Sequence, residues 1–328
     1  MRVFVAGASG AIGSRIVPQL IDRGHDVIGT FHSAGGAERV RALGAQPVAL
    51  DLLDARAVRI AVLEAAPDAI VHQVTALANI RFSRNFDSVF AQTNRLRTEG
   101  TDALLAAAGE AGVRRFVAQS YASARHARTG GMIKTEDDPL DPTPPRTTRE
   151  SHAAMRHLEQ AVTDAGGTVL RYGVFYGAHN DGLIEPVRKR QFPVVGDGGG
   201  VSSFIHLDDA AAATVLALEH DVAGIYNVVD DEPAPAREWL PVLAEALGAK
   251  PPRRVPVWLA RMVAGDAAVM LGTEARGASN AKARREFGWE LRYPSWRQGF
   301  RAAYGPAEAS AGGSGAGRTS LSVQSSPR

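Results

Sequence analysis

Short apolar runs alternate with amphipathic segments along the first half of the chain. The runs are rich in β-branched residues and are bounded by Gly, Asp or Pro, a pattern typical of buried strands. We predict strands at Val3–Ala6, Val27–Gly29, Pro47–Leu50, Ala69–His72, Phe116–Ala118 and Thr168–Arg171. The segments between them have helical periodicity, as where Ile12, Ile16 and Leu20 recur at four-residue spacing. Strands alternating with crossover helices indicate an α/β fold with a doubly wound parallel sheet.

The pattern changes after Arg171. Elements become shorter and are separated by loops rich in Gly or Pro, such as Val195–Val201. We therefore predict a first domain over residues 1–171 and a smaller α/β lobe over residues 172–305 that closes over the carboxyl edge of the sheet. Residues 306–328 are mostly Ala, Gly and Ser. Such a composition does not offset the entropy of ordering, so we predict a disordered tail.

Composition and charge exclude several classes of function. The formal net charge is +2 and no long basic run occurs, which argues against binding to nucleic acid. The chain has no cysteine, so disulfides, thiolate nucleophiles and sulfur-ligated zinc are excluded. The most apolar later stretch, Val257–Leu271, contains Arg261 and Asp266 and is too short to span a bilayer. We expect a cytoplasmic protein that uses no metal, no membrane and no nucleic acid.

A glycine-rich turn follows the first predicted strand. It reads Gly7-Ala8-Ser9-Gly10-Ala11-Ile12-Gly13 and leads into an amphipathic helix. Glycines at this spacing permit a tight turn, close approach of the backbone to a pyrophosphate, and close packing of helix on strand. The N-terminus of the helix offers free N–H groups to the phosphates. The turn therefore predicts a dinucleotide site of the Rossmann type, with cofactor contacts from Gly7, Ser9, Gly10, Ala11, Ile12 and Gly13.

The spacing of these glycines resembles that of the short-chain dehydrogenase/reductase superfamily. Further landmarks occur in the order found in its extended branch, the NAD-dependent epimerase/dehydratase family. They are Asp51-Leu52-Leu53-Asp54, Glu99–Ala108, Leu170–Gly177, Phe204–Ala210 and Phe287-Gly288-Trp289. The resemblance covers about residues 1–300. It implies that the first domain binds the dinucleotide and that the second lobe binds the substrate.

The resemblance also indicates which residues meet the cofactor. It places Asp51 and Leu52 at the adenine and Val74 beside the cofactor. The position that is acidic in NAD-specific members corresponds to Phe31, which His32 and Ser33 follow. An acidic residue there would repel a 2′-phosphate. Since none is present and Arg39 and Arg41 are nearby, we expect NADP(H) in preference to NAD(H), unless those arginines lie on a solvated helix face and the enzyme does not discriminate.

The proton-transfer residues of the superfamily do not match as well. Its members use a Tyr, a Lys four residues later and a Ser or Thr, and in this branch a Glu follows the Lys by four residues. With Glu159 in that place, Ser151 and Met155 occupy the Tyr and Lys positions, and neither exchanges protons as a Tyr–Lys pair does. The Ser/Thr position falls on Tyr121, with Ser120 beside it. Our candidate catalytic residues are therefore Tyr121, Ser120 and His152.

Three functions are compatible with this sequence. We expect an NAD(P)(H)-dependent oxidoreductase that acts on a carbonyl or alcohol of a small organic substrate with a nonstandard proton donor. The alternatives are a nucleotide-sugar epimerase or dehydratase, or a cofactor-binding protein without redox turnover, such as a sensor, cyclase or isomerase. Relatives of the epimerase kind often carry an Arg where this chain has Gly200–Ser203. The resemblance further implies a homodimer formed through helices near 94–111 and 150–165.

Overall fold

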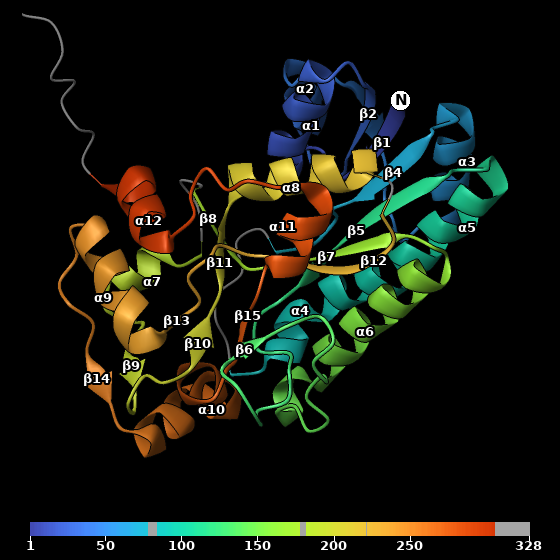
Figure 1. Cartoon of the computed structure of the whole chain (residues 1–328). Helices are drawn as coiled ribbons and strands as arrows, with labels where there is room; N and C mark the ends of the chain where they lie inside the picture. Colours follow the sequence, from blue (N-terminus) through green and yellow to red (C-terminus); the bar gives the residue numbers. More distant parts are fainter. Residues whose placement is uncertain (78–83, 178–181, 221, 306–328) are drawn as a thin grey trace, which may run out of the picture.

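A computed structural model describes residues 1–77, 84–177, 182–220 and 222–305. The predicted disordered tail, residues 306–328, lies outside the described residues. Figure 1 shows a central sheet with helices on both faces and a smaller lobe beside it. Among the described helices, none is both long and apolar enough to cross a membrane.

The central sheet has seven parallel strands and confirms the predicted α/β fold. Their order across the sheet is β3-β2-β1-β4-β5-β7-β12. The strands are β1 (Arg2–Ala6), β2 (Asp26–Phe31), β3 (Gln46–Ala49), β4 (Ala69–His72), β5 (Arg115–Tyr121), β7 (Thr168–Tyr172) and β12 (Gly224–Val228). Six of the seven coincide with predicted strands, whereas β12 was not predicted. The direction of winding reverses between β1 and β4, and their carboxyl ends mark the crevice where such sheets bind ligands.

Two apolar layers attach helices to the faces of this sheet. On one face, Val3, Val5 and Val71 pack against α1 (Gly13–Asp22), α2 (Gly36–Ala42), α8 (Leu207–His220) and α11 (Ala281–Phe287). On the other face, Phe4, Ile70 and neighbouring strand residues pack against α3 (Ala55–Ala65), α5 (Thr101–Ala111) and α6 (Arg149–Asp164). Figure 1 shows α1 and α8 on one side of the sheet and α6 on the other.

A continuous helical segment leads from the sheet's crevice back along this second face. It consists of α4 (Phe86–Arg95), a π-helical turn over Leu96–Gly100, and α5. Asn85 begins α4 by accepting a hydrogen bond from the Ser88 N–H at 3.4 Å. π-helical turns are rare and occur frequently at functional sites.

The smaller lobe consists of short strand pairs and helices. The pairs are β8 (Val174–Tyr176) with β11 (Phe204–His206), β9 (Val194–Val195) with β14 (Arg254–Val255), β10 (Val201–Ser202) with β13 (Ala234–Pro235), and β6 (Ile133–Lys134) with β15 (Gly277–Ala278). The helices are α7 (Ile184–Arg188), α9 (Ala236–Ala246), α10 (Val257–Thr273) and α12 (Trp296–Tyr304). Aromatic side chains fill its core, where Phe204 meets Trp239 and Phe300 edge to face.

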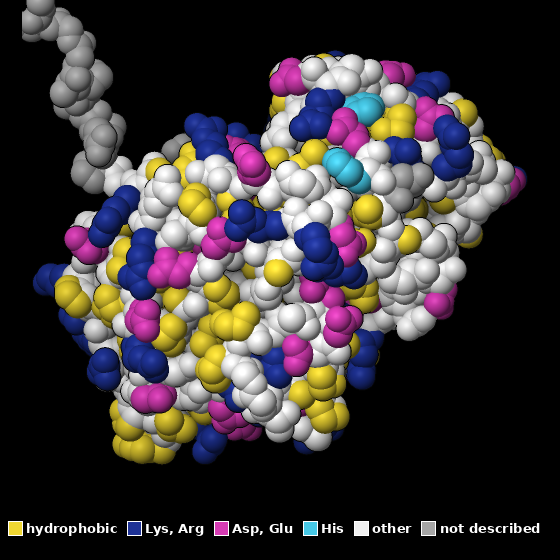
Figure 2. Space-filling model, in the orientation of Figure 1, with side chains coloured by type: hydrophobic (Ala, Val, Ile, Leu, Met, Phe, Trp, Pro, Cys, Tyr) yellow, Lys and Arg dark blue, Asp and Glu magenta, His cyan; other side chains and the backbone are white. Residues whose placement is uncertain are grey.

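Two elements that follow residue 172, where the substrate lobe was predicted to begin, belong to the layers of the central sheet. Helix α8 packs on α1 in the first apolar layer, and β12 forms the edge of the central sheet beside β7. Charged side chains of both signs are interspersed over the face seen in Figure 2. Within the described ranges, no group of three His, Asp or Glu side chains is placed to hold a metal ion.

Candidate functional site

The glycine turn lies at the carboxyl end of β1, at the predicted crevice. Gly7 has a φ of +90°, which favours glycine, and its N–H donates to Thr30 Oγ1 at 2.9 Å. A Cβ at Gly7 would lie 3.1 Å from the carbonyl carbon of Gln73, which immediately precedes Val74. The turn at the end of β1 and the residues that follow β4 are therefore in direct contact.

Gly13 is the tightest point of the turn. A Cβ at this position would lie 2.2 Å from Gly7 O and 2.8 Å from Ala8 Cα. By contrast, a Cβ at Gly10 would be 3.2 Å from Gly7 O. The two backbone segments touch because residue 13 has no side chain, which is the packing role predicted for the last glycine of the motif.

The turn presents donors rather than side chains. Gly10 and Ala11 are exposed, and within the described part of the chain no backbone carbonyl accepts the N–H of Ala11 or Ile12. α1 begins at Gly13, so its positive end lies at the same place. Free N–H groups beside a helix N-terminus fit a pyrophosphate.

The end of β2 carries the residues expected to select between NADP and NAD. Phe31 covers Gly36 at the start of α2, where a Cβ would lie 2.6 Å from that of Phe31. His32 and Ser33 are exposed, and Arg39 Nη2 donates to Ser33 Oγ at 2.9 Å. Arg41 instead faces Glu38, at 3.8 Å. A hydroxyl and a guanidinium therefore stand together where no carboxylate is present.

The segment after β3 contains the two residues predicted at the adenine, of which one is exposed and one is buried. Asp51 is exposed and accepts a hydrogen bond from the Leu53 N–H at 3.0 Å. Leu52 is 3% exposed and lies against Gly100, where a Cβ would be 3.4 Å from that of Leu52. Asp54 caps α3 by accepting from the N–H groups of Arg56 and Ala57. The backbone of this segment is thus fixed at both ends beside the crevice.

At the end of β5 the structure contains a buried ionic network centred on Glu159. This carboxylate accepts from Ser120 Oγ at 2.7 Å and from Arg171 Nε and Nη2 at 2.9 and 2.8 Å, and it forms an ion pair with Arg125. Arg125 Nη1 also donates to Ser120 Oγ at 3.1 Å. Although burial acts to raise it, the pKa of Glu159 falls to about 2 because of the two arginines. Ser120 therefore belongs to this network, and no motif or spacing in the sequence pointed to Arg125.

Ser151 and Met155 are buried on α6. Ser151 Oγ donates to Asp87 Oδ1 at 2.7 Å and accepts from Asn94 Nδ2 at 3.2 Å. Asp87 also accepts from the Ser151 N–H at 2.9 Å. Met155 is 6% exposed and offers neither a charge nor an acidic proton. The Ser151 hydroxyl is thus engaged on both sides in contacts that tie α6 to α4.

The candidate catalytic residues Tyr121 and His152 lie on β5 and α6, respectively. Tyr121 is the last residue of β5, in register with Tyr172 of β7. Burial raises the pKa of its phenol, and the positive charge of Arg97 opposes that rise. His152 is 8% exposed, and burial together with Arg125 lowers its pKa to about 4. Its imidazole is therefore neutral at neutral pH and suits a base better than an acid.

Sequence reasoning did not select Arg97 as a site residue. It lies in the π turn, three residues before Gly100. It is 6% exposed and interacts electrostatically with Arg125, Glu159 and Tyr121. Burial, followed by repulsion from Arg125, lowers its pKa to about 10, so it remains charged at neutral pH. None of the motifs identified in the sequence includes it.

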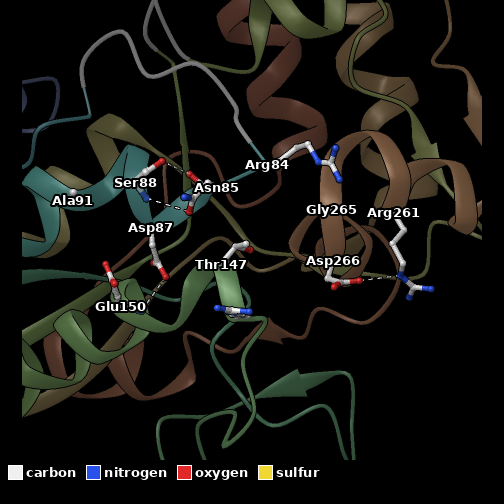
Figure 3. A pocket seen from close by; sticks show the side chains of 11 residues that line it. Arg84, Asn85, Asp87, Ser88, Ala91, Thr147, Glu150, Arg261, Gly265 and Asp266 are labelled. Carbon is white, nitrogen blue, oxygen red and sulfur yellow. Dashed lines mark hydrogen bonds and ion pairs between the residues drawn. The ribbon is translucent and has the colours of Figure 1, made fainter.

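A cavity of about 740 Å³ lies beside α4 and the start of α6 (Figure 3). Asp87 lines it, and the same carboxylate binds Ser151. The charged residues of its wall are Arg84, Arg146, Arg261, Asp87, Glu150 and Asp266. In Figure 3, Arg261 is paired with Asp266 across one side. Cations and carboxylates are equal in number, so the wall has no marked preference for either charge.

Comparison with known proteins agrees with this geometry. The model of the NAD dependent epimerase/dehydratase family matches residues 3–229. A 3-diazoavenalumate denitrifying reductase from a Streptomyces species is 44% identical over 312 residues, which cover 92% of this chain and 99% of that protein. A 4-hydroxy-2-methyl-3-oxo-4-farnesyl-3,4-dihydroquinoline-1-oxide ketoreductase from Stigmatella aurantiaca is 30% identical, covering 76% of this chain and 74% of its own. The crystal structure of the UDP-glucose 4-epimerase of Thermus thermophilus in complex with NAD has a TM-score of 0.71 at 28% identity, covering 93% of this chain and 98% of that one.

Proposed function

Because the chain belongs to the NAD-dependent epimerase/dehydratase family, we propose that it is an NADPH-dependent reductase that replaces the diazo group of a small aromatic substrate by hydrogen. The family and the reductases among its relatives support the general activity. The substrate class is our inference from the relative that is 44% identical along almost its whole length and from the chemistry of the reacting end. By the reacting end we mean the end of β5 at Tyr121 together with residues Ser151–Met155 of α6.

The observation that carries this proposal is the state of α6 at the Tyr and Lys positions implied by the family pattern. Ser151 is engaged with Asp87 and Asn94, and Met155 has no proton to exchange. In addition, none of the four lysines in the sequence has a tyrosine four residues before it. We therefore propose a reaction in which α6 supplies no proton.

Reduction of a diazo group meets that requirement. Hydride addition to a carbonyl leaves an oxyanion that must be protonated, which is the task of a general acid. An arenediazonium group instead accepts the hydride on its terminal nitrogen, giving Ar–N=N–H. Loss of N₂ then leaves Ar–H, in which the new hydrogen is the former hydride. The substrate gains the two electrons that a bound dihydronicotinamide would supply with the hydride, and no proton from the protein enters the product.

The cofactor fits the residues at the carboxyl ends of β1, β2 and β3. We propose that the N–H groups of the turn at Gly10–Gly13 bind the pyrophosphate and that Asp51, Leu52 and Val74 line the dinucleotide. Arg39 and Ser33 would bind a 2′-phosphate, which favours NADPH over NADH; their mutual hydrogen bond of 2.9 Å supports this preference. When bound, the nicotinamide supplies the hydride.

Ketone reduction is the second candidate. The ketoreductase among the relatives supports it, and Tyr121 would donate the proton, since its phenol lies at the end of β5 within electrostatic reach of Arg97. Ser120 is less suited, because its hydroxyl is donated to Glu159. His152 is less suited because its neutral imidazole is a poor acid.

The expected homodimer also remains a proposal. Its helices would be those near residues 94–111 and 150–165. In the monomer, α6 is tied to α4 by Asn94 and to α5 by the hydrogen bond between His157 Nε2 and Asp102 Oδ1 at 2.8 Å. Sedimentation velocity of the full chain measures the oligomeric state directly.

The test combines the full chain with NADPH and three substrates: 3-diazoavenalumate, a panel of ketones, and UDP-glucose. We expect NADPH oxidation and N₂ release with 3-diazoavenalumate, retained in Tyr121→Phe. With NADPH deuterated at the transferred position, the deuterium should appear on the ring carbon that carried nitrogen.

Other outcomes select other functions. Ketone reduction that Tyr121→Phe abolishes would establish the second candidate. Conversion of UDP-glucose to its 4-epimer would establish an epimerase. If none of the substrates is consumed although NADPH binds, the protein belongs to the class without redox turnover and the reductase proposal is refuted.

A further inference from the structure

Arg97 is a largely buried cation at the reacting end that forms no ion pair with a carboxylate. Arg97 is 6% exposed, and among the residues that the structure describes its guanidinium has no hydrogen bond and no ion pair, while its nitrogens keep a small contact with solvent. A charge buried without a partner is costly, and native proteins pair such charges or bring them to a ligand. Arg97 is therefore a candidate for a contact that a ligand completes.

Two contacts fix the height of Arg97 along α6. Before it, Asn94 donates to Ser151 at 3.2 Å; after it, Asp102 pairs with His157 at 2.8 Å. Both residue numbers rise together, so the α4–α5 segment and α6 run in the same direction. Interpolation between these two contacts places Arg97 level with about residue 153 of α6, within one turn of Met155. The facing segment therefore places a cation within one turn of the α6 position where the family pattern implies a lysine.

The groups around Arg97 leave a positive excess. Glu159 interacts with it, yet that carboxylate is already bound by Arg125, Arg171 and Ser120. Asp87 of α4 is engaged by Ser151 and the Glu150 N–H.

The nearby histidines carry no charge at neutral pH and therefore do not change this positive excess. His72 and His152 are neutral at neutral pH, since burial lowers the pKa of each to about 4. The end of β5 is therefore electropositive, unlike the balanced wall of the cavity in Figure 3.

We propose that Arg97 binds a negatively charged oxygen of the substrate, either a carboxylate or a phenolate. A guanidinium is suited to oxyanions, which it binds through two parallel hydrogen bonds. The cofactor phosphates do not fill this role, since their turn follows β1 and is two strand spacings, about 10 Å, from β5. The assignment rests on the proposed function, because it takes the end of β5 as the place where the substrate reacts.

The test uses three probes that differ by one group each. They are 4-hydroxybenzoate, its methyl ester, which lacks the carboxylate, and 4-methoxybenzoate, which lacks the ionisable phenol. Calorimetric titration of the full chain saturated with NADP⁺ gives their dissociation constants. Arg97→Gln should weaken the anionic probe about 10- to 100-fold, and Arg97→Lys should recover part of the loss.

The control is Arg95→Gln. Arg95 lies two residues earlier and forms an exposed pair with Glu99 at 2.8 Å, so its loss should leave all three affinities unchanged. Thermal melting and the dissociation constant of NADP⁺ show whether each variant is folded and loaded.

Each outcome decides the proposal. Loss confined to the two carboxylate probes identifies a carboxylate, and loss confined to the two phenols identifies a phenolate; both support Arg97 as the site. Equal affinities of Arg97→Gln and the wild type for every probe, or no binding of any probe to the wild type, overturn it. Because binding needs no turnover, this failure is separate from a failure to reduce 3-diazoavenalumate.

Discussion

The two ends of the crevice differ in the chemical groups that form them: backbone at the cofactor end and side chains at the reacting end. At the cofactor end, binding is built from the backbone: Gly7 and Gly13 bring two segments into contact, and free N–H groups face the crevice. At the reacting end the site is formed by side chains, with Ser151 and Met155 at the positions where the family pattern implies Tyr and Lys, and with Arg97 facing them. Backbone sites depend on the fold and tolerate few substitutions, whereas side-chain chemistry can be exchanged on the same helices.

A buried ionic network holds the reacting end in place. Glu159 connects α6 to β5 and β7 through Ser120 and Arg171, so the network supports the same elements that carry Tyr121 and Ser151. The two ends therefore differ in the groups that line them, whereas close packing or hydrogen bonds hold both in place.

The largest expected effect is on that frame. Glu159→Gln leaves Arg125 and Arg171 buried without a carboxylate, and breaking a buried pair in this way costs about 3–5 kcal/mol. We expect the free energy of unfolding, measured in urea at pH 7, to fall by that amount.

The matched control for this measurement is Glu110→Gln. Glu110 forms an exposed ion pair with Arg59 on the same face of the sheet, and exposed pairs add little stability. Equal stabilities of the Glu159 and Glu110 variants would show that the network is not a structural frame.

The next effect tests the cofactor end. In Gly13→Ala the new Cβ would lie 2.2 Å from Gly7 O, so the turn must open and misplace its donors, a displacement that costs about 100-fold. We expect NADPH to bind about 100-fold more weakly by fluorescence titration, and Gly10→Ala to lose less, since its Cβ would be 3.2 Å from the same oxygen.

Gly109→Ala is the control for the glycine substitutions. Gly109 lies in α5 with open space around its Cβ direction, and alanine favours a helix. If Gly13→Ala binds NADPH as tightly as Gly109→Ala does, the turn is not the pyrophosphate site.

A smaller effect concerns the choice of cofactor. Arg39→Ala removes the guanidinium beside Ser33 and should reduce the preference for NADPH over NADH about tenfold, equal to about 1.4 kcal/mol. Arg41→Ala should change nothing, because Arg41 faces Glu38. The ratio of the two dissociation constants in each variant is the measurement, and an unchanged ratio in Arg39→Ala excludes Arg39 from the 2′-phosphate site.

The same contrast explains what could be predicted from the sequence. Six strands were predicted because period and bounding residues are local signals, and the glycine turn because its physical demands fix residue types at fixed spacing. The strand β12 was not predicted, since an edge strand that returns after a second lobe depends on packing between distant segments. Arg125 was missed for the same reason: its role depends on Glu159, which is distant in sequence.

The smallest expected effect separates the candidate proton donors. Because burial and Arg125 lower the pKa of His152 to about 4, this side chain is neutral throughout pH 6–8 and its loss should leave the shape of the pH profile of kcat/KM unchanged. A general acid contributes about 100-fold or more, so a decrease smaller than about threefold in His152→Gln would remove it from that role.

The stability of the same variant gives an independent check with a defined sign. A histidine whose folded pKa is lowered from 6.5 to about 4 binds its proton more readily in the unfolded state. Its contribution is therefore complete above pH 6.5 and is lost as the pH falls towards 4, by about 1.4 kcal/mol per pH unit. His152→Gln should lose less stability than the wild type across this window. An equal loss would mean that His152 is protonated in the folded enzyme, which would restore it as an acid at the reacting end.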